Sequence, residues 1–270
     1  MAKEGGRIAL ELMQDSEPTL KPDRSVLTKA DTAVSLLMRH ELEDLLSASR
    51  HILIDEEDAQ GEKYFDQRLL ESAPYIWVID PIDGTRSFSN RMPFFGVSIG
   101  LLKELRPWLG VVYFPMLDEL FYADGKNAYF VADAFSAQER REIIKPIDQD
   151  VNRQTIIYGN DGFFRTHDWD FDFCQMMMPS CAVIDLCWPA IGRGVGGFFD
   201  SNLWDFAGSW PIFEKANLQL RSLSTGKVLD RIHTELFQGK GSRTWKLKEQ
   251  HILSSERNYA VIKNCMRAKG

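Results

Sequence analysis

Two aspartates stand directly after an apolar run in the first third of the chain. Residues 75–79 are rich in β-branched and aromatic side chains, which predicts a buried strand. Asp80 and Asp83 follow this run, and Gly84 and Thr85 lead from them into a predicted helix. Carboxylates are the hard oxygen ligands that divalent cations prefer, and free backbone amides at the start of a helix bind anions. The stretch therefore predicts a cation site beside a phosphate site.

Two further acidic segments have a similar setting. Asp55–Asp58 follows the short apolar strand predicted at 51–54, and Asp205 follows Trp204 at a predicted helix start. Taken alone, the first is typical of a solvated loop, and Asp205 is typical of a helix cap. Taken with Asp80 and Asp83, they predict a two-metal site. Two cations about 4 Å apart need several bridging and terminal carboxylates, and so many clustered charges would be costly without cations.

The elements that must position these acids are predicted first in the N-terminal part. Helical spacing of apolar residues predicts helices over residues 2–14 and from the N-cap Thr28 to Ala48. After the central stretch, alternating apolar residues and turn signals predict an antiparallel meander. Its strands are expected at 94–102, 108–114, 119–123 and 128–132. The charged segment 136–153 is predicted to separate two domains, 1–148 and 149–270.

The second half gives weaker patterns. We expect a strand at 155–159 and then a helix that contains Phe171, Phe173, Met176 and Met177. A helix is predicted from Trp204 to Asn217, because Trp204 and Asp205 are followed by a further apolar run. The last predicted elements are a strand at 251–254 and a C-terminal helix from Glu256.

Composition excludes several classes of protein. The chain has 270 residues and a formal net charge of −7, which argues against a nucleic-acid-binding scaffold with a basic face. No run approaches the roughly 18 apolar residues of a membrane span, and no signal peptide is visible. The four cysteines show no C-x-x-C spacing, so buried free thiols in a reducing, cytoplasmic compartment are expected. They are Cys174, Cys181, Cys187 and Cys265.

Four strings together resemble the inositol monophosphatase family of Mg²⁺-dependent, lithium-sensitive phosphatases. They are LTKAD at 27–31, IDEED at 54–58, WVIDPIDGTRSF at 77–88 and LWDFAG at 203–208. The resemblance implies an α/β (α+β) fold, a layered α-β-α-β-α sandwich with the active site between two halves. It further implies a homodimer with two or three Mg²⁺ ions per site, acting on a small phosphorylated metabolite.

The resemblance also implies a set of metal ligands. Glu56, which is also a catalytic residue in this set, would hold the first metal, and Asp80 would bridge two metals. The Ile82 carbonyl would complete the first site. Asp83 and Asp205 would hold the second metal, and Asp205 would also contact substrate.

The remaining implied roles concern the phosphate and the attacking water. Gly84 and Thr85 would give backbone amides to the phosphate, and Asp31 would form with Thr85 the pair that polarises the water. Glu57 would support the ligands from behind, and Lys21 lies near the position of a basic residue that reaches the site. Cations that neutralise the phosphoryl oxygens, activate water for in-line attack and stabilise the leaving alkoxide suit this reaction.

The chain departs from the family pattern at several positions. Asp55 replaces the glycine that usually precedes the paired acids, and we expect its side chain to face solvent. Residues 180–185 replace the G-[TS]-A-A helix start, and residues 214–217 replace E-A-G-G. Asp200 is the nearest equivalent of a glutamate that contacts substrate hydroxyls. The catalytic centre is therefore predicted to be intact and the substrate wall to be altered.

The favoured function is hydrolysis of a small phosphate monoester, most of all inositol monophosphate. Histidinol phosphate is an alternative, because Arg86 after D-G-T occurs in that branch of the family. A 3′,5′-bisphosphate nucleotide and fructose 1,6-bisphosphate are others. Two alternatives from different classes are a non-catalytic regulator and a nucleotide-dependent oxidoreductase. The glycine-rich 192–197 favours a turn over a dinucleotide loop, since no strand and helix frame it.

Overall fold

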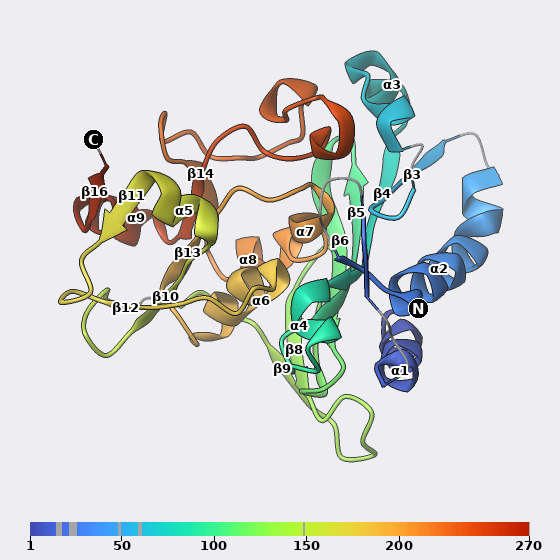
Figure 1. Cartoon of the computed structure of the whole chain (residues 1–270), viewed down its shortest axis with the longest axis horizontal. Helices are drawn as coiled ribbons and strands as arrows, with labels where there is room; N and C mark the ends of the chain where they lie inside the picture. Colours follow the sequence, from blue (N-terminus) through green and yellow to red (C-terminus); the bar gives the residue numbers. More distant parts are fainter. Residues whose placement is uncertain (15–17, 22–25, 48–49, 59–60, 148, 270) are drawn as a thin grey trace.

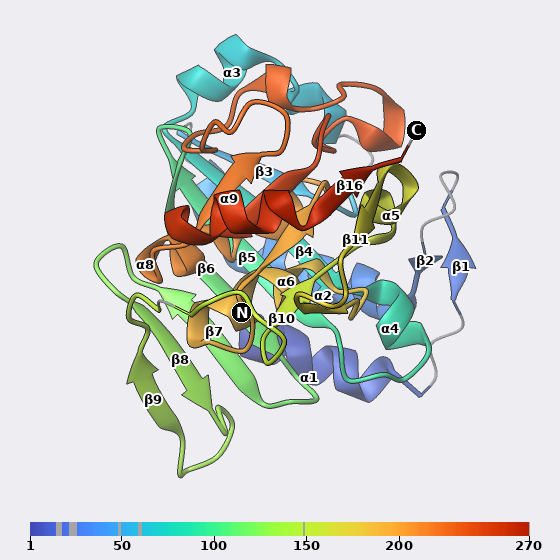
Figure 2. The same ribbon diagram turned by 90° about the vertical axis from the view of Figure 1, so that its left-hand side faces the viewer.

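The computed structural model describes residues 1–14, 18–21, 26–47, 50–58, 61–147 and 149–269. Two β-sheets and three helical layers alternate across the molecule (Figure 1). Helices α1 and α2 cover one face of a seven-stranded sheet, and α6, α7 and α8 lie between that sheet and a five-stranded one. Helices α5 and α9 lie on the far side (Figures 1 and 2). This α-β-α-β-α order confirms the predicted fold class.

The helices are mostly short. Their bounds are α1 Ala2–Leu12, α2 Lys29–Ser47, α3 Gln67–Ser72, α4 Thr85–Ser89, α5 Asp161–Thr166, α6 Ala182–Cys187, α7 Trp204–Ala207, α8 Trp210–Lys215 and α9 Glu256–Asn264. Single 3-10 turns are η1 Gly61–Tyr64, η2 Trp188–Ile191, η3 Thr234–Leu236 and η4 Gly241–Arg243. Among the described helices, none reaches the length and hydropathy of a membrane span.

The seven-stranded sheet has the strand order β3-β4-β5-β6-β7-β8-β9. Its strands are β3 His51–Asp55, β4 Tyr75–Asp83, β5 Gly96–Lys103, β6 Arg106–Phe114, β7 Glu119–Ala123, β8 Ala128–Ala132 and β9 Arg140–Ile143. Only β3 and β4 are parallel, so the predicted antiparallel meander is confirmed. Strand β9 falls in the charged segment that we predicted as a boundary. Its four residues are exposed, and charged side chains are typical of a protected sheet edge.

The five-stranded sheet has the order β12-β10-β13-β15-β14. Its strands are β10 Ile156–Tyr158, β12 Gln175–Met177, β13 Gly196–Phe199, β14 Gln219–Ser222 and β15 His251–Ser254. Two small antiparallel pairs are β1 Thr19–Leu20 with β2 Val26–Leu27, and β11 His167–Trp169 with β16 Met266–Ala268. The strands predicted at 155–159 and 251–254 are confirmed, as is the C-terminal helix.

The prediction of a helix around residues 171–177 is wrong. This segment forms a turn and then strand β12, which pairs in parallel with β10. Phe171 and Phe173 are 50% and 37% exposed, so their spacing does not mark a buried helical face. Backbone pairing with a strand nearly twenty residues upstream outweighs the local apolar pattern, because strand formation depends strongly on tertiary context.

The single helix predicted from Trp204 to Asn217 is two helices, α7 and α8. The break lies at Gly208 and Ser209, just before Pro211, whose nitrogen cannot donate a helical hydrogen bond. The bend sits tightly on the sheet: a Cβ added to Gly110 in β6 would lie 2.1 Å from the Gly208 carbonyl oxygen. The close approach places α7, which carries Asp205, directly over β4 and β5.

All four cysteines are free and buried, as predicted. Trp169 and Trp210 belong to the buried core, and Trp188 packs against it while partly exposed. These three residues therefore serve packing.

Asp55 does not face solvent, so that expectation was wrong. It is 1% exposed at the end of β3. Its Oδ2 accepts hydrogen bonds from Ser35 Oγ at 2.6 Å and from Arg39, whose Nη2 lies 2.6 Å away. Its Oδ1 accepts the backbone N–H of Glu57 at 3.0 Å. Asp55 therefore ties helix α2 to the turn that carries the paired glutamates.

We predict that Asp55→Ala lowers the free energy of unfolding by about 3 kcal/mol. Removing one partner of a buried ion pair leaves the other charge and its donors unpaired. Urea unfolding of the variant measures the loss. Glu43→Ala on the exposed side of α2 is the control, with an expected change within about 0.5 kcal/mol. Equal stabilities for Asp55→Ala and the wild type would contradict this role.

Candidate active site

A cleft of about 450 Å³ lies where the two sheets' ends meet the central helices. Its lining comes from the end of β4 and the start of α4 in the N-terminal part. It also comes from the start of α6, the residues before α7 and Lys246 in the C-terminal part. Figure 1 shows α4, α6 and α7 gathered at this place between the two sheets. Neither half alone would form the cleft.

Three predicted metal ligands are brought together on the cleft wall. One carboxylate oxygen from each of Asp80, Asp83 and Asp205 lies within 4.8 Å of the other two. Asp80 and Asp83 are 1% and 6% exposed. Asp80 Oδ1 is buried and has no hydrogen-bond partner among the described residues. A buried carboxylate oxygen without a donor is the expected state of a cation ligand when no cation is placed beside it.

Burial and mutual repulsion act on all of these acids. Burial, followed by the charge of Asp83, raises the pKa of Asp205 to about 7. Burial raises the pKa of Asp83 to about 6, although hydrogen bonds from Val183 and Cys181 oppose the rise. Asp80 has a pKa well above its usual range, first from burial and then from the charges of Glu56 and Asp83. The residues fit divalent cations, which would remove the repulsion and supply the missing partner.

Glu56 and Glu57 lie beside this cluster, and both pair with the ammonium group of Lys21. Lys21 Nζ is 3.1 Å from Glu56 Oε1 and 2.7 Å from Glu57 Oε1. Burial raises the pKa of both glutamates to about 7 against the effect of Lys21. The basic residue expected near the site therefore reaches it, and its ammonium contacts the glutamate predicted to hold the first metal.

The pair predicted to polarise water is also assembled. Thr85 Oγ1 lies 3.3 Å from Asp31 Oδ1 and 3.0 Å from the carbonyl oxygen of Ile82. Asp31 is fully buried, and its Oδ2 accepts hydrogen bonds from the Thr28 backbone and hydroxyl. Burial raises the pKa of Asp31 to about 6. Thr28 thus fixes Asp31, and Asp31 faces Thr85 at the cleft.

Gly84 makes the turn that brings Thr85 into this position. Its φ is +84°, and a Cβ there would lie 2.7 Å from the Phe94 carbonyl oxygen and 3.0 Å from the Cys181 Cβ. Left-handed backbone and close contact together require glycine. Arg86, two residues after Gly84, is exposed and lines the cleft.

The second half holds Asp83 in place. Asp83 Oδ2 accepts a hydrogen bond from the Val183 N–H at 2.7 Å and lies 3.1 Å from Cys181 Sγ. Both donors belong to the start of α6, where this chain departs from the G-[TS]-A-A pattern. Sequence reasoning located the departure but missed the contact, because nothing in the spacing links residues about 100 positions apart.

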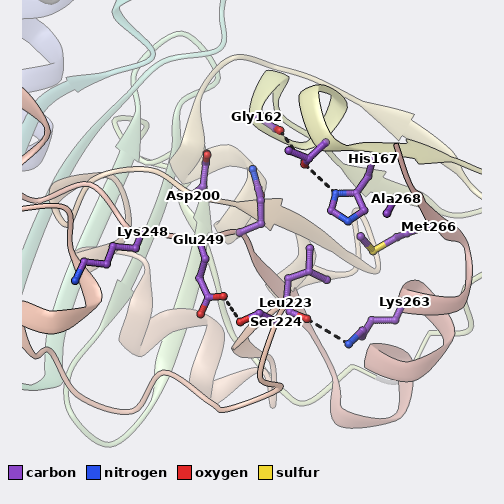
Figure 3. Close-up of a pocket in the computed structure, with 12 residues that line it drawn as sticks. Gly162, His167, Asp200, Leu223, Ser224, Lys248, Glu249, Lys263, Met266 and Ala268 are labelled. Atoms are coloured by element: carbon purple, nitrogen blue, oxygen red, sulfur yellow. Dashed lines mark hydrogen bonds between the residues drawn. The ribbon is translucent and has the colours of Figure 1, made fainter. Parts of the chain in front are cut away.

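Asp200 does not line this cleft. It lies on the wall of a second cavity of about 580 Å³, shown in Figure 3. Asp200 Oδ1 is 3.4 Å from Asn160 Nδ2, and its Oδ2 is 3.6 Å from Lys246 Nζ. Asn160 and Lys246 both line the cleft. The contact expected between Asp200 and the substrate therefore stays a prediction. Asn160 and Lys246, which lie next to Asp200, are the residues that reach the cleft.

Sequence reasoning missed several cleft residues, among them Asp185 and Lys246. Asp185, in α6, is 7% exposed, and its Oδ1 is buried without a partner among the described residues. A lone carboxylate within the apolar stretch 181–190 is a signal that could have indicated it. Lys246 lies in a polar connecting segment with no pattern that would single it out.

Comparison with known proteins decides the family. The family model described as inositol monophosphatase family matches residues 3–260. The chain belongs to the inositol monophosphatase family. Membership supports a phosphatase as the activity class, and the cleft presents the acids that the family resemblance implies.

Several curated members of the inositol monophosphatase family are similar to the chain. Inositol monophosphatase 1 of Solanum lycopersicum is 30% identical over 227 residues, 80% of this chain and 79% of that protein. Inositol monophosphatase 3 of the same plant is 33% identical over 148 residues, and a fructose-1,6-bisphosphatase/inositol-1-monophosphatase of Aquifex aeolicus (strain VF5) is 32% identical over 149 residues. These two matches span about half the length of the relatives, 54% and 55%.

Solved structures of the inositol monophosphatase family show the same fold. The extragenic suppressor protein suhB from Bartonella henselae aligns with a TM-score of 0.73 and 20% identity, over 98% of this chain and 94% of that chain. An IMPase from Thermotoga maritima aligns with a TM-score of 0.71 and 18% identity, over 98% of this chain and 92% of that chain. The likeness over nearly the whole of each chain supports the layered sandwich.

We predict that this family member becomes less stable in EDTA as pH rises from about 5 to 8. A carboxyl whose folded pKa is raised binds more protons folded than unfolded, so its stabilising effect is complete below about pH 4 and is lost as pH rises through the folded value. The pKa values near 6 and 7 of Asp83, Asp205 and Glu56 place the loss in this window.

Thermal unfolding at a series of pH values measures this effect. Adding Mg²⁺ should raise the Tm more at pH 8 than at pH 5, since protons no longer compete for the ligands. Asp83→Asn, which cannot ionise, should show a shallower decline in EDTA. A metal-free Tm that rises between pH 5 and 8, or the same slope in the variant, would contradict the clustered-acid account.

We also predict that Cys181→Ala raises the Mg²⁺ concentration for half-maximal activity by about tenfold. It removes a donor that orients Asp83, a predicted metal ligand, and loss of such supporting hydrogen bonds weakens metal sites by this order. Cys181→Ser keeps a donor and should stay within about twofold of the wild type. Cys187→Ala, a buried thiol on the same helix, controls for the small cavity. Equal Mg²⁺ dependence of Cys181→Ala and Cys187→Ala would disprove the positioning role.

Proposed function

We propose that the protein is a Mg²⁺-dependent phosphatase that hydrolyses a small phosphate monoester, with inositol monophosphate as the favoured substrate. The observation that carries the proposal is the convergence of Asp80, Asp83 and Asp205 on one buried point of a cleft that also contains Thr85. The family assignment supports the same activity.

The proposed cation ligands are the Ile82 carbonyl and four carboxylates. The carboxylates are those of Glu56, Asp80, Asp83 and Asp205. When bound, Mg²⁺ would neutralise the phosphoryl oxygens, activate water and stabilise the leaving alkoxide. The number of ions, two or three, is part of the proposal. A single cation would leave part of this charge uncompensated.

Side-chain and backbone groups of the protein would bind the phosphate, orient the water and accept its proton. The backbone amides of Gly84 and Thr85 would hold the phosphate in line, and Thr85 Oγ1 would orient the attacking water by a hydrogen bond. Asp31 Oδ1, 3.3 Å from that hydroxyl, would accept the proton that Thr85 passes on. Its raised pKa, about 6, suits a group that must take up a proton near neutral pH.

The alcohol side of the cleft supports a polyol. Asp185 Oδ1 is a buried acceptor without a partner among the described residues, and Ser180, Ser201 and Asn202 add polar groups to the lining. Such groups can hydrogen-bond the hydroxyls of a polyol. A dual-specific IMPase/NADP phosphatase of similar structure has been solved with D-inositol-1-phosphate bound, which supports the same choice by analogy. A homodimer in the cytoplasm completes the proposal, and the four unpaired thiols support a reducing compartment.

We predict that Asp80→Asn and Asp205→Asn each lower phosphate release by about a thousandfold or more while the fold is retained. Each removes a ligand whose charge holds cations that supply several kcal/mol of transition-state stabilisation. Phosphate release is measured with Mg²⁺ and with EDTA, and circular dichroism checks folding. Asp44→Asn, exposed on α2, is the control and should keep full activity.

The substrate is tested by a panel of inositol phosphates, histidinol phosphate, fructose 1,6-bisphosphate and adenosine 3′,5′-bisphosphate. Mg²⁺-dependent turnover that is fastest with inositol monophosphate supports the proposal. Normal turnover by either aspartate variant would overturn the site assignment. No release from any compound would instead favour a non-catalytic role.

A further inference from the structure

The cleft contains a lysine, Lys246, that has no role in the proposed reaction. Lys246 lines the cleft and belongs to the connecting segment 231–249, between β14 and β15. This segment docks through Trp245, which is 2% exposed and packs edge-on against Phe65 and Phe237. The lysine is therefore carried by a well-packed part of the structure.

The backbone around Lys246 is fixed against the residues that lead into α7. Leu203 donates its N–H to the Trp245 carbonyl at 3.0 Å, and Leu247 donates its N–H to the Ser201 carbonyl at 3.0 Å. Asn202 and Lys246 thus face each other as an antiparallel bridge. Asp205, at the start of α7, follows three residues after Asn202. The pairing sets Lys246 beside the cluster, near enough for its charge to oppose the rise in the pKa of Asp205.

The ammonium group itself has unused hydrogen-bonding capacity. Its one ion-pair partner in the described part of the chain is Asp200, whose Oδ2 is 3.6 Å from Nζ and so beyond hydrogen-bond distance. Lys246 is 31% exposed in its side chain. A lysine ammonium carries three donors. Lys21, in contrast, contacts two glutamates at 3.1 and 2.7 Å.

We propose that Lys246 makes the cleft favour, between two alcohols of similar skeleton, the one that carries a second anionic group, a phosphate or a carboxylate. The inference rests on the proposed phosphatase function and adds a preference to it; inositol monophosphate, whose alcohol is uncharged, stays the favoured monophosphate. With the reacting phosphate held at Gly84 and Thr85, an additional anion on the alcohol would reach the ammonium from within the same cleft of about 450 Å³. Asp200 Oδ2, 3.6 Å from Nζ, lies near the ammonium but accepts no hydrogen bond from it.

The neighbouring lysine provides a matched control. Lys248 is exposed and lines the second cavity instead of the cleft. Figure 3 shows its side chain pointing away from Asp200. Lys246 and Lys248 thus lie two residues apart on one segment, with the same charge and different surroundings. Comparing their variants separates a local contact from a general change in charge.

The experiment uses two matched pairs of phosphate monoesters with the wild type, Lys246→Met, Lys246→Arg and Lys248→Met. Glycerol 2-phosphate and 2-phosphoglycerate differ by a carboxylate, and fructose 1-phosphate and fructose 1,6-bisphosphate differ by a phosphate. The wild type should show a higher kcat/KM for the more anionic member of at least one pair. Lys246→Met should reduce that preference about tenfold, the scale of one charged hydrogen bond. Lys246→Arg and Lys248→Met should keep it.

Calorimetric binding of the same compounds with Ca²⁺ in place of Mg²⁺ gives a readout that does not need turnover. A preference lost in Lys246→Met alone supports the inference, and the pair that shows it tells carboxylate from phosphate. No preference in the wild type, or an unchanged preference in Lys246→Met, overturns it while the phosphatase stands. Absence of turnover with all compounds overturns the phosphatase, and the binding ratios then decide the role of Lys246.

Discussion

Repulsion between buried carboxylates is the constraint on which the rest of the structure depends. Oxygens of Asp80, Asp83 and Asp205 lie within 4.8 Å of one another, and Glu56 adds its charge from the turn after β3. Folding places these groups in a poorly solvated wall where several of their pKa values rise to 6 or 7. A protein that keeps such an arrangement gains stability and chemistry together when cations occupy it.

The scaffold imposes this arrangement through both halves of the chain. Strand β4 is held between β3 and β5, and its pairing with β5 shifts register between Asp80 and Asp83. Pro81 lies inside that irregular stretch and cannot donate to the ladder, so the two carboxylates need not alternate across the sheet. From the other half, α6 supplies donors to Asp83 and α7 supplies Asp205. Residues from both halves of the chain therefore meet at this cluster of acids.

Local pattern predicted much of this architecture, and its failures have physical reasons. The apolar run before Asp80 and the turns between strands were sufficient to predict β4 and the meander. The helix around Phe171 was mispredicted because pairing of β12 with β10 outweighs local spacing. Asp55 was expected to face solvent, but it is buried beside Arg39, which donates a hydrogen bond to it. Arg39 lies sixteen residues earlier in the chain, and no spacing rule linked the two residues. Convergence of Glu56 and Asp205 followed from the family resemblance, since 149 positions separate them. Lys246 gave no signal at all.

The most direct measurement is anomalous diffraction from crystals grown with Mn²⁺, a divalent ion that prefers the same oxygen ligands and can be located by its scattering. We expect at least two anomalous peaks, about 4 Å apart. One should contact Glu56, Asp80 and the Ile82 carbonyl, and the other Asp80, Asp83 and Asp205. Fully occupied Mn²⁺ elsewhere with no peak between these carboxylates, and Asp80 Oδ1 still unpartnered, would contradict the central claim.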